Sequence, residues 1–277
     1  MTGATPAAAQ DRDGPRTAPP ASFKDVLTAE WTKIRTVPST FWTLLAGSLV
    51  VVGFSALWAL AFASTYEQMS EADRTSIVPT APMQIAFYFG MVIFGVLGVL
   101  AVTGEYGTGM IRTSLTATPR RPLFLAAKAL VVAGVVLVVG LVVSFLSFFL
   151  SQPILNTQDL GGSLGDEGVF RAVAGGGVYL ALIAVMALAI GVIVRHTAGA
   201  IVTVFVILFV LGIVGGFLPG EWGTTLNKYL PSNAGGAILV PVEQAGTLPP
   251  WGGLGMFALY TAVACAVAML LFQSRDA

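Results

Sequence analysis

Charged side chains are scarce in this sequence. They make up 10% of its residues, whereas soluble domains carry about 25%. Hydrophobic residues make up 56%, and the mean hydropathy is +0.84. These values place the chain outside the soluble class. The formal net charge is zero, so the composition provides no basic surface for nucleic acid, and we expect no nucleic-acid partner.

Cysteine and histidine occur once each, as Cys265 and His196. One thiol cannot form an internal disulfide or a zinc cluster, so Cys265 is expected to be a small buried hydrophobe within an apolar run. A single histidine excludes multi-histidine metal sites. We interpret His196, beside Arg195, as a solvated turn residue. The sequence thus predicts no metal site and no cofactor.

Motifs of catalysis and nucleotide binding are also missing. The chain has no HExxH. The letters GxSxG occur once, at 161–165, but in a segment between two predicted spans and not in the strand-to-helix turn of a nucleophile elbow. It has no phosphate-binding GxxxxGK[ST], because none of its lysines follows a glycine. We therefore expect no catalytic residues, and the energy for any work on a substrate must come from another protein.

Long apolar runs are the main feature that is present. Six of them meet the requirement of roughly 20 residues for a membrane span, at about 42–63, 84–103, 124–150, 169–194, 199–218 and 251–272. The sequence predicts an all-α membrane protein with six transmembrane helices. Asp and Glu are absent from the interiors of these runs, which removes the usual markers of ion coupling. Sodium can still bind backbone and hydroxyl oxygens, so an ion-coupled transporter or channel stays open as an alternative.

The distribution of basic residues predicts the orientation. Three of the 14 lie in the segments that would face outward: Arg74, Arg171 and Lys228. The other eleven lie at or near the opposite ends of the spans: Arg12, Arg16, Lys24, Lys33, Arg35, Arg112, Arg120, Arg121, Lys128, Arg195 and Arg275. By the positive-inside rule, both termini are expected in the cytoplasm, in a multi-pass protein of the plasma membrane.

The chain is expected to form one membrane domain, residues 22–277, after a disordered cytoplasmic tail, residues 1–21. The tail is rich in Ala, Pro and polar residues, with too little apolar surface to fold. Five prolines interrupt the segment 219–250 between the last two spans. Its pieces are too short to cross a bilayer. They suit short helices that dip into the outer leaflet, or a plain extracellular loop.

Residues 22–40 contain a predicted amphipathic helix that ends before Pro38. Ser22 followed by Asp25 fits a capping box at the helix start. Apolar side chains recur at helical spacing at Phe23, Val26, Leu27, Trp31 and Ile34. The other positions hold Lys24, Asp25, Glu30, Lys33 and Arg35. A helix of this kind, with an interfacial tryptophan, is expected to lie in the membrane plane and contact lipid. A solvated anchor is the alternative.

Residues 104–123 form a polar, glycine- and proline-containing segment between spans two and three. Glu105 follows the second span, and the segment MIRTSLTA predicts a short helix that stops at Pro119. Arg120 and Arg121 are then expected to meet lipid headgroups. A short helix held between two spans would be a suitable contact point for a soluble motor. From composition alone, a basic loop that only sets topology is an equal alternative.

The order Glu105, a glycine pair, Arg112, TPRR and Lys128 resembles the first cytoplasmic loop of ABC-2-type transporter permeases. The segment AEWTKIRTVPSTFWTLL at 29–45 is similar to the connecting helix of that family, particularly in actinobacterial members. The resemblance implies a coupling helix that docks on an ATPase subunit. It assigns coupling roles to Glu105, Gly109, Arg112, Pro119 and Lys128, and connecting-helix roles to Trp31, Lys33 and Arg35. The chain departs from the family at Gly109-Met110, where Gly-Thr is common.

The resemblance implies the permease subunit of an ABC exporter. It would pair with a second copy of itself or a related permease, and with a separate ATP-hydrolysing subunit. The polar groups within the spans are mainly Ser, Thr and Tyr, which favours an amphipathic or lipid-like substrate such as a drug, peptide or lipid. The alternatives are an ion-coupled secondary transporter or channel, and a non-transporting membrane scaffold or sensor.

Overall fold

The computed structural model describes residues 22–118, 120–244 and 246–275. The predicted disorder of residues 1–21 and the predicted role of Pro119 fall outside these ranges. Every regular element in the described ranges is helical, which confirms the all-α class. Six helical segments are long and apolar enough to cross a membrane. They are α2 (Pro38–Thr65), α4 (Ala81–Gly107), α6 (Arg121–Leu155), α7 (Val169–Val194), the fifth span, and α12 (Pro250–Ser274).

The fifth span is built from three consecutive segments: α8 (Thr197–Phe205), a π-helical stretch η3 (Val206–Val210) and α9 (Leu211–Gly216). A π-turn inserts an extra residue into a helical turn, so it changes which side chains of the helix face its neighbours. The last part of this span packs against the short helices that follow it.

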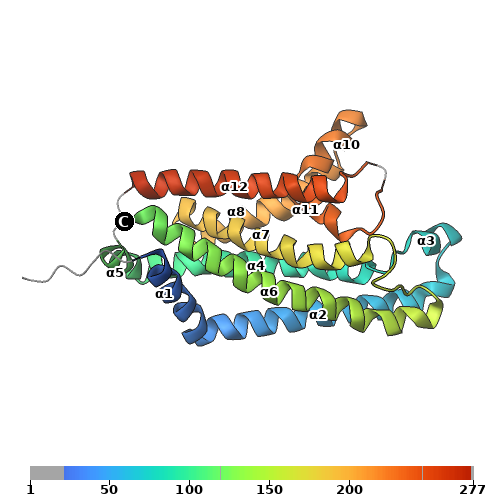
Figure 1. Cartoon of the computed structure of the whole chain (residues 1–277). Helices are drawn as coiled ribbons and strands as arrows, with labels where there is room; N and C mark the ends of the chain where they lie inside the picture. Colours follow the sequence, from blue (N-terminus) through green and yellow to red (C-terminus); the bar gives the residue numbers. More distant parts are fainter. Residues whose placement is uncertain (1–21, 119, 245, 276–277) are drawn as a thin grey trace, which may run out of the picture.

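Helix α7 is the centre of the bundle (Figure 1). It packs against α6, α4 and α12, whereas α2 packs against the outer sides of α4 and α6. In the most apolar window of each span, 72% of the residues of α7 are buried, compared with 22% in α2 and α12. The outer helices therefore leave wide apolar faces for contact with lipid or with another protein.

Glycine determines how closely α7 approaches its neighbours. A Cβ atom added at Gly98 of α4 would lie 2.1 Å from the backbone oxygen of Ala184 in α7. A Cβ atom added at Gly177 of α7 would lie 2.7 Å from the backbone nitrogen of Leu141 in α6. Glycine is thus required at both positions because backbone atoms of the next helix occupy the space of a side chain.

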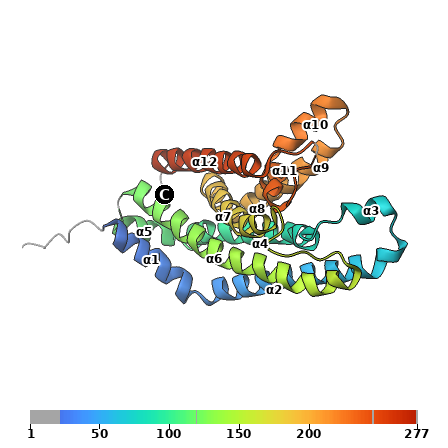
Figure 2. The ribbon, with the colours of Figure 1, turned by 45° about the vertical axis from the view of Figure 1, so that its right-hand side comes forward.

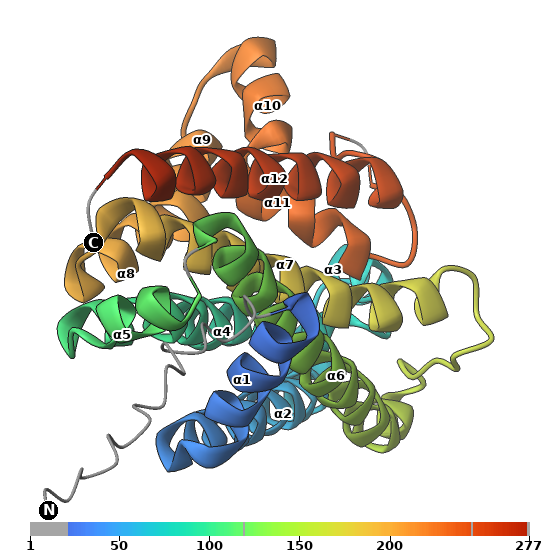
Figure 3. The same cartoon turned by 60° about the vertical axis from the view of Figure 1, so that its left-hand side comes forward.

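The two ends of the bundle differ (Figures 1 and 2). One end, which we call the α5 end, carries α1 (Phe23–Thr36), α5 (Met110–Ala117), the start of α6 and the end of α12. Figure 3, which brings this side forward, shows α1 lying across α6. The other end, the α3 end, carries α3 (Glu71–Ser76) and the 3-10 turns η1 (Tyr66–Gln68) and η2 (Asn156–Gln158).

The proline-interrupted segment forms short helices at the α3 side of the bundle, as the spacing of its prolines predicts. They are α10 (Gly220–Tyr229), α11 (Pro231–Gly236) and the 3-10 turn η4 (Ala237–Leu239). Helix α10 projects away from the bundle (Figures 2 and 3), whereas α11 and η4 pack against α12. The insertion of this segment into a bilayer remains a prediction.

Candidate functional site

Helix α1 begins with the capping box that its sequence predicts. The backbone nitrogen of Ser22 donates to Asp25 Oδ2 at 2.9 Å, and the backbone nitrogen of Asp25 donates to Ser22 Oγ at 3.4 Å. Hydrogen bonds from Ser22 lower the pKa of the Asp25 carboxyl. The helix ends at Thr36, the next residue Val37 is extended, and Pro38 is the first residue of α2. These signals fix both ends of α1 locally.

The packed face of α1 differs from its predicted apolar face. Trp31 is 50% exposed and Phe23 is 40% exposed. Glu30, which the sequence pattern assigns to the polar face, is only 4% exposed. That assignment is wrong because the Glu30 carboxylate pairs with Lys33 of the same helix and with the distant Lys128, which lies on α6 and covers it.

Four charged side chains meet at the α5 end, and we call them the four-charge cluster: Glu30, Lys33, Glu105 and Lys128. Lys128 Nζ lies 2.6 Å from Glu30 Oε2 and 2.8 Å from Glu105 Oε1. Lys33 Nζ lies 2.7 Å from Glu30 Oε1 and 2.9 Å from Glu105 Oε1. Each ammonium therefore bridges both carboxylates, and the cluster joins α1 to the end of α4 and the start of α6.

The cluster is largely shielded from solvent. Glu105 and Lys128 are buried like Glu30, and only Lys33 is partly exposed. Both ammonium groups lie over the ring of Phe124, at 5.5 Å for Lys33 and 5.2 Å for Lys128 from the ring centroid. Two positive and two negative charges balance in this space, so no net charge is buried as long as all four groups remain.

The ammonium of Lys33 shows the balance of forces at the cluster. Burial is the largest single influence on the pKa of Lys33, and it disfavours the charged form. Hydrogen bonds and Coulomb attraction from Glu30 and Glu105 favour the charged form, and their combined effect is larger. The pKa of Lys33 is therefore raised, and the side chain stays charged at neutral pH. Lys33 Nζ also donates to Ser114 Oγ of α5 at 3.3 Å, which connects the cluster to the short helix.

The short helix predicted for the segment MIRTSLTA is present as α5, and its coupling role remains a prediction. Gly109 precedes it with a φ of 70°, a left-handed conformation that glycine adopts without strain. Ile111 faces the core and is 3% exposed, while Met110 is 44% exposed and Arg112 is exposed. Helix α5 is thus anchored by one side and presents Arg112 on the other.

The structure brings together only part of the predicted site. Glu105, Lys128 and Lys33 meet in the four-charge cluster, and Gly109 forms the turn between α4 and α5. Arg112, Trp31 and Arg35 lie apart from the cluster as exposed side chains. Sequence reasoning missed Glu30 as a site residue. A carboxylate three positions before a lysine, on the side of α1 that also carries Val26, was the available signal.

The sequence suggested that Arg121 meets lipid headgroups, but the structure places its guanidinium against the end of α12. Its Nη1 atom donates to the backbone oxygens of Phe272 at 3.1 Å and Arg275 at 2.8 Å. The last carbonyls of a helix have no partner within the helix, so a nearby guanidinium satisfies them better than solvent does. Arg275 in turn donates to the backbone oxygen of Ile193 at 3.0 Å. The C-terminal end of α12 is thereby tied to α6 and α7.

The remaining candidate ligands have local roles. Nδ1 of His196 accepts from the backbone nitrogen of Gly199 at 3.2 Å and caps the start of α8. Cys265 is partly buried in α12. Within the described ranges, no group of three His, Cys, Asp or Glu side chains lies close enough together to hold a metal ion.

The amino-acid sequence matches the model of a known protein family. A family model described as an ABC-2 family transporter protein matches residues 26–215, which include most of α1, all of α5 and nearly all of the first five spans. The chain belongs to the ABC-2 transporter family. It is a multi-pass membrane component of such a transporter. The match confirms the family resemblance but does not support the actinobacterial likeness. A search of curated proteins finds no match.

Proposed function

We propose that this ABC-2 protein is the permease subunit of an ATP-driven exporter. It works with a second permease copy, its own or a related one, and with a separate subunit that binds and hydrolyses ATP. The α5 end faces the cytoplasm, where both termini lie, and the α3 end faces outward. The eleven basic residues assigned to the cytoplasmic side support this orientation.

The four-charge cluster is the observation that carries the proposal. Because Lys33 and Lys128 each bridge Glu30 and Glu105, α1 is joined to two spans by buried ionic hydrogen bonds. Displacing α1 alone would leave charges unpaired in a shielded site, which is costly. Movement of α1 is therefore passed to α4 and α6.

Helix α5 supplies the contact with the ATPase in this proposal. It follows α4 directly, and Lys33 of α1 donates to Ser114 on it. Closure of the ATPase on the exposed side of α5 would displace α5 and α1 together. Since α4 and α6 both pack against α7, the spans would rock between inward- and outward-facing arrangements. The substrate class we propose is an amphipathic or lipid-like molecule.

Charge reversal at Arg112 tests the proposal. Arg112 is exposed on α5, so Arg112→Glu is expected to change the stability of the permease by no more than about 0.5 kcal/mol. At an interface, however, the same change replaces attraction by repulsion, which can cost several kcal/mol of binding. We expect normal membrane expression with loss of co-purification of the co-expressed ATPase subunit, and loss of ATP-dependent export.

Glu243→Lys provides the matched control, since Glu243 is an exposed charge in the segment before α12. This variant should bind the ATPase like the parent. If Arg112→Glu keeps full ATPase binding and export, the segment between α4 and α6 does not couple the two subunits. Transport by the permease alone in proteoliposomes with an imposed ion gradient, and without any ATPase, would favour the ion-coupled carrier instead.

A further inference from the structure

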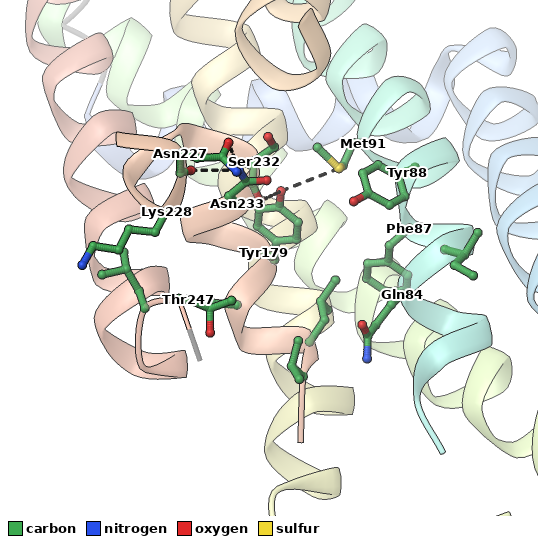
Figure 4. A pocket seen from close by; sticks show the side chains of 17 residues that line it. Gln84, Phe87, Tyr88, Met91, Tyr179, Asn227, Lys228, Ser232, Asn233 and Thr247 are labelled. Atoms are coloured by element: carbon green, nitrogen blue, oxygen red, sulfur yellow. Dashed lines mark hydrogen bonds between the residues drawn. The ribbon is translucent and has the colours of Figure 1, made fainter. Parts of the chain in front are cut away.

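A cavity of about 420 Å³, seen from close by in Figure 4, lies beside the first turns of α4, and no residue of the four-charge cluster lines it. Its walls come from the first turns of α4, from α7, and from the segment that contains α10 and α11. Ligand pockets commonly measure about 300–1,000 Å³. The cavity therefore has the size of a small-molecule site.

One wall of the cavity is apolar and rigid. It is formed by Phe87 and Met91 of α4 and by Tyr179 of α7, all of which are buried. The ring of Tyr179 packs edge-on against Phe257 at 5.2 Å between centroids, and its hydroxyl donates to the backbone oxygen of Ser232 at 3.3 Å. Contacts of this kind fix the aromatic surface before any ligand arrives.

Amide and hydroxyl side chains provide the polar part of the lining. Asn233 Nδ2 donates to Asn227 Oδ1 at 2.8 Å, and Gln84 Nε2 donates to Thr80 Oγ1 at 2.8 Å. Among the described residues, no hydrogen bond uses Asn227 Nδ2 or Gln84 Oε1. Figure 4 shows Gln84 and Thr247 on opposite sides of the same end of the cavity. The lining thus offers a spare donor and a spare acceptor next to an apolar wall.

The lining carries almost no charge. Among the described residues that line it, none is a carboxylate and one, Lys228, is basic. The Lys228 side chain extends away from the cavity in Figure 4, and its Nζ lies 5.2 Å from the centroid of the Tyr229 ring. A charged ligand would lose its hydration without gaining an opposite charge, so the lining favours a neutral one.

We propose that this cavity binds an uncharged amphiphile. Its hydroxyl- or amide-bearing head contacts Gln84 and Thr247, and its apolar body packs against Phe87, Met91 and Tyr179. The inference deepens the exporter function proposed above, because the role of the site in transport rests on that function. Binding itself requires neither ATP nor the ATPase, so it can be tested separately.

Two glycines allow a matched test of the cavity. A Cβ atom added at Gly236, which lines the cavity, would have no heavy atom within 4 Å, and the same is true of Gly255 in α12. Gly236→Leu therefore adds a side chain at the cavity lining, and its Cβ atom meets no backbone atom. Gly255→Leu makes the same change on an exposed face of α12. The probe is a decanoyl monoacylglycerol with a diazirine on its chain, presented to the permease alone in phosphatidylcholine nanodiscs.

We expect light-induced labelling of α4 near Phe87–Met91 in the parent and in Gly255→Leu. Labelling should fall about tenfold in Gly236→Leu, which corresponds to roughly 1.4 kcal/mol of binding. The same chain on a phosphate headgroup should label this region less than the monoacylglycerol does. Gln84→Met, which removes the polar head contact while keeping the length of the side chain, should also weaken labelling by the monoacylglycerol.

Equal labelling of the parent and Gly236→Leu would overturn the proposal, as would stronger labelling by the phosphate probe. Labelling confined to side chains exposed on the outer surface of the bundle, such as Leu130 and Val138, would overturn it too. These results would leave the coupling function untouched, because that function is tested through Arg112 and the ATPase. A neutral lipid that co-purifies with the parent and is lost in Gly236→Leu would support the proposal and identify the bilayer as its source.

Discussion

Lys128 Nζ lies 2.6 Å from Glu30 Oε2, although 98 residues separate the two in the sequence. One side chain belongs to a helix that precedes all six spans, and the other belongs to the start of the third span. Both are buried, so neither charge can be rehydrated without moving a helix. This pair makes α1 part of the bundle rather than an independent anchor.

Removal of Lys128 should be strongly destabilising. Lys128→Met leaves Glu30 and Glu105 to share Lys33 alone, so one carboxylate is buried without its own counter-charge. Breaking a buried ion pair in this way costs about 3–5 kcal/mol. We expect a clearly lower midpoint of thermal unfolding in detergent, followed by the fluorescence of the purified protein.

A second substitution distinguishes charge imbalance from lost packing. Adding Glu105→Gln to Lys128→Met restores neutrality, because the Glu30–Lys33 pair remains. The double variant should unfold at a higher temperature than Lys128→Met. Lys24→Met, at an exposed position of the same α1 helix, should change stability by no more than about 0.5 kcal/mol. A double variant that is less stable than Lys128→Met would contradict the role given to charge balance.

Two glycines of α4 should respond in opposite directions to the same substitution. Gly98→Ala forces a methyl group against the backbone oxygen of Ala184, so we expect a loss of at least about 2 kcal/mol. Gly104 has no heavy atom within 4 Å of an added Cβ, and Gly104→Ala should stabilise the helix by about 0.5–1 kcal/mol. Thermal midpoints of the two variants check the prediction, and equal effects would refute the close α4–α7 contact.

The proposed orientation can be checked with single cysteines in a Cys265→Ser background. An impermeant thiol reagent applied to intact cells should label Asp73→Cys and Glu167→Cys, which lie at exposed positions near the α3 end. It should not label Thr116→Cys, at an exposed position of α5, until the cells are opened. Labelling of position 116 in intact cells would reverse the orientation.

The capping box should control fraying at the start of α1. Ser22→Ala removes the acceptor for the Asp25 backbone nitrogen, so amides of the first turn should exchange hydrogen faster at pH 7 than in the parent. The pKa of Asp25 is lowered in the folded state. Its contribution to the stability of the first turn is therefore present above the unfolded pKa of about 3.9, and is lost as the pH falls through the folded pKa. Unchanged exchange in Ser22→Ala would show that tertiary contacts alone hold this turn.

Much of the fold was predictable because its signals are local. Apolar runs of sufficient length predicted the six spans, and Ser22, Asp25 and Pro38 predicted both ends of α1. The prolines between the last two spans gave short helices there. The central place of α7 was not predictable, since all six runs are similarly apolar and only the three-dimensional packing separates them.

The site was predictable only in part. Glu105 and Lys128 were identified through a family resemblance, and the match to the ABC-2 family model confirms that resemblance. Glu30 was placed on the wrong face because its partner Lys128 is distant in sequence. Arg121 was assigned to headgroups for the same reason, since the carbonyls it contacts belong to residues 272, 273 and 275. Spacing within one helix does not reveal contacts made by another.

The positions of the four clustered charges also bear on how the protein is made. All of them precede residue 129, so every member of the cluster has left the ribosome before α7 (Val169–Val194) is synthesised. The ionic contacts can close while only the earlier spans are in the bilayer. The most buried helix of the protein, α7, would then insert against earlier helices that the cluster already holds together. A substitution at residue 30 or 128 would therefore impair membrane assembly before it could affect transport.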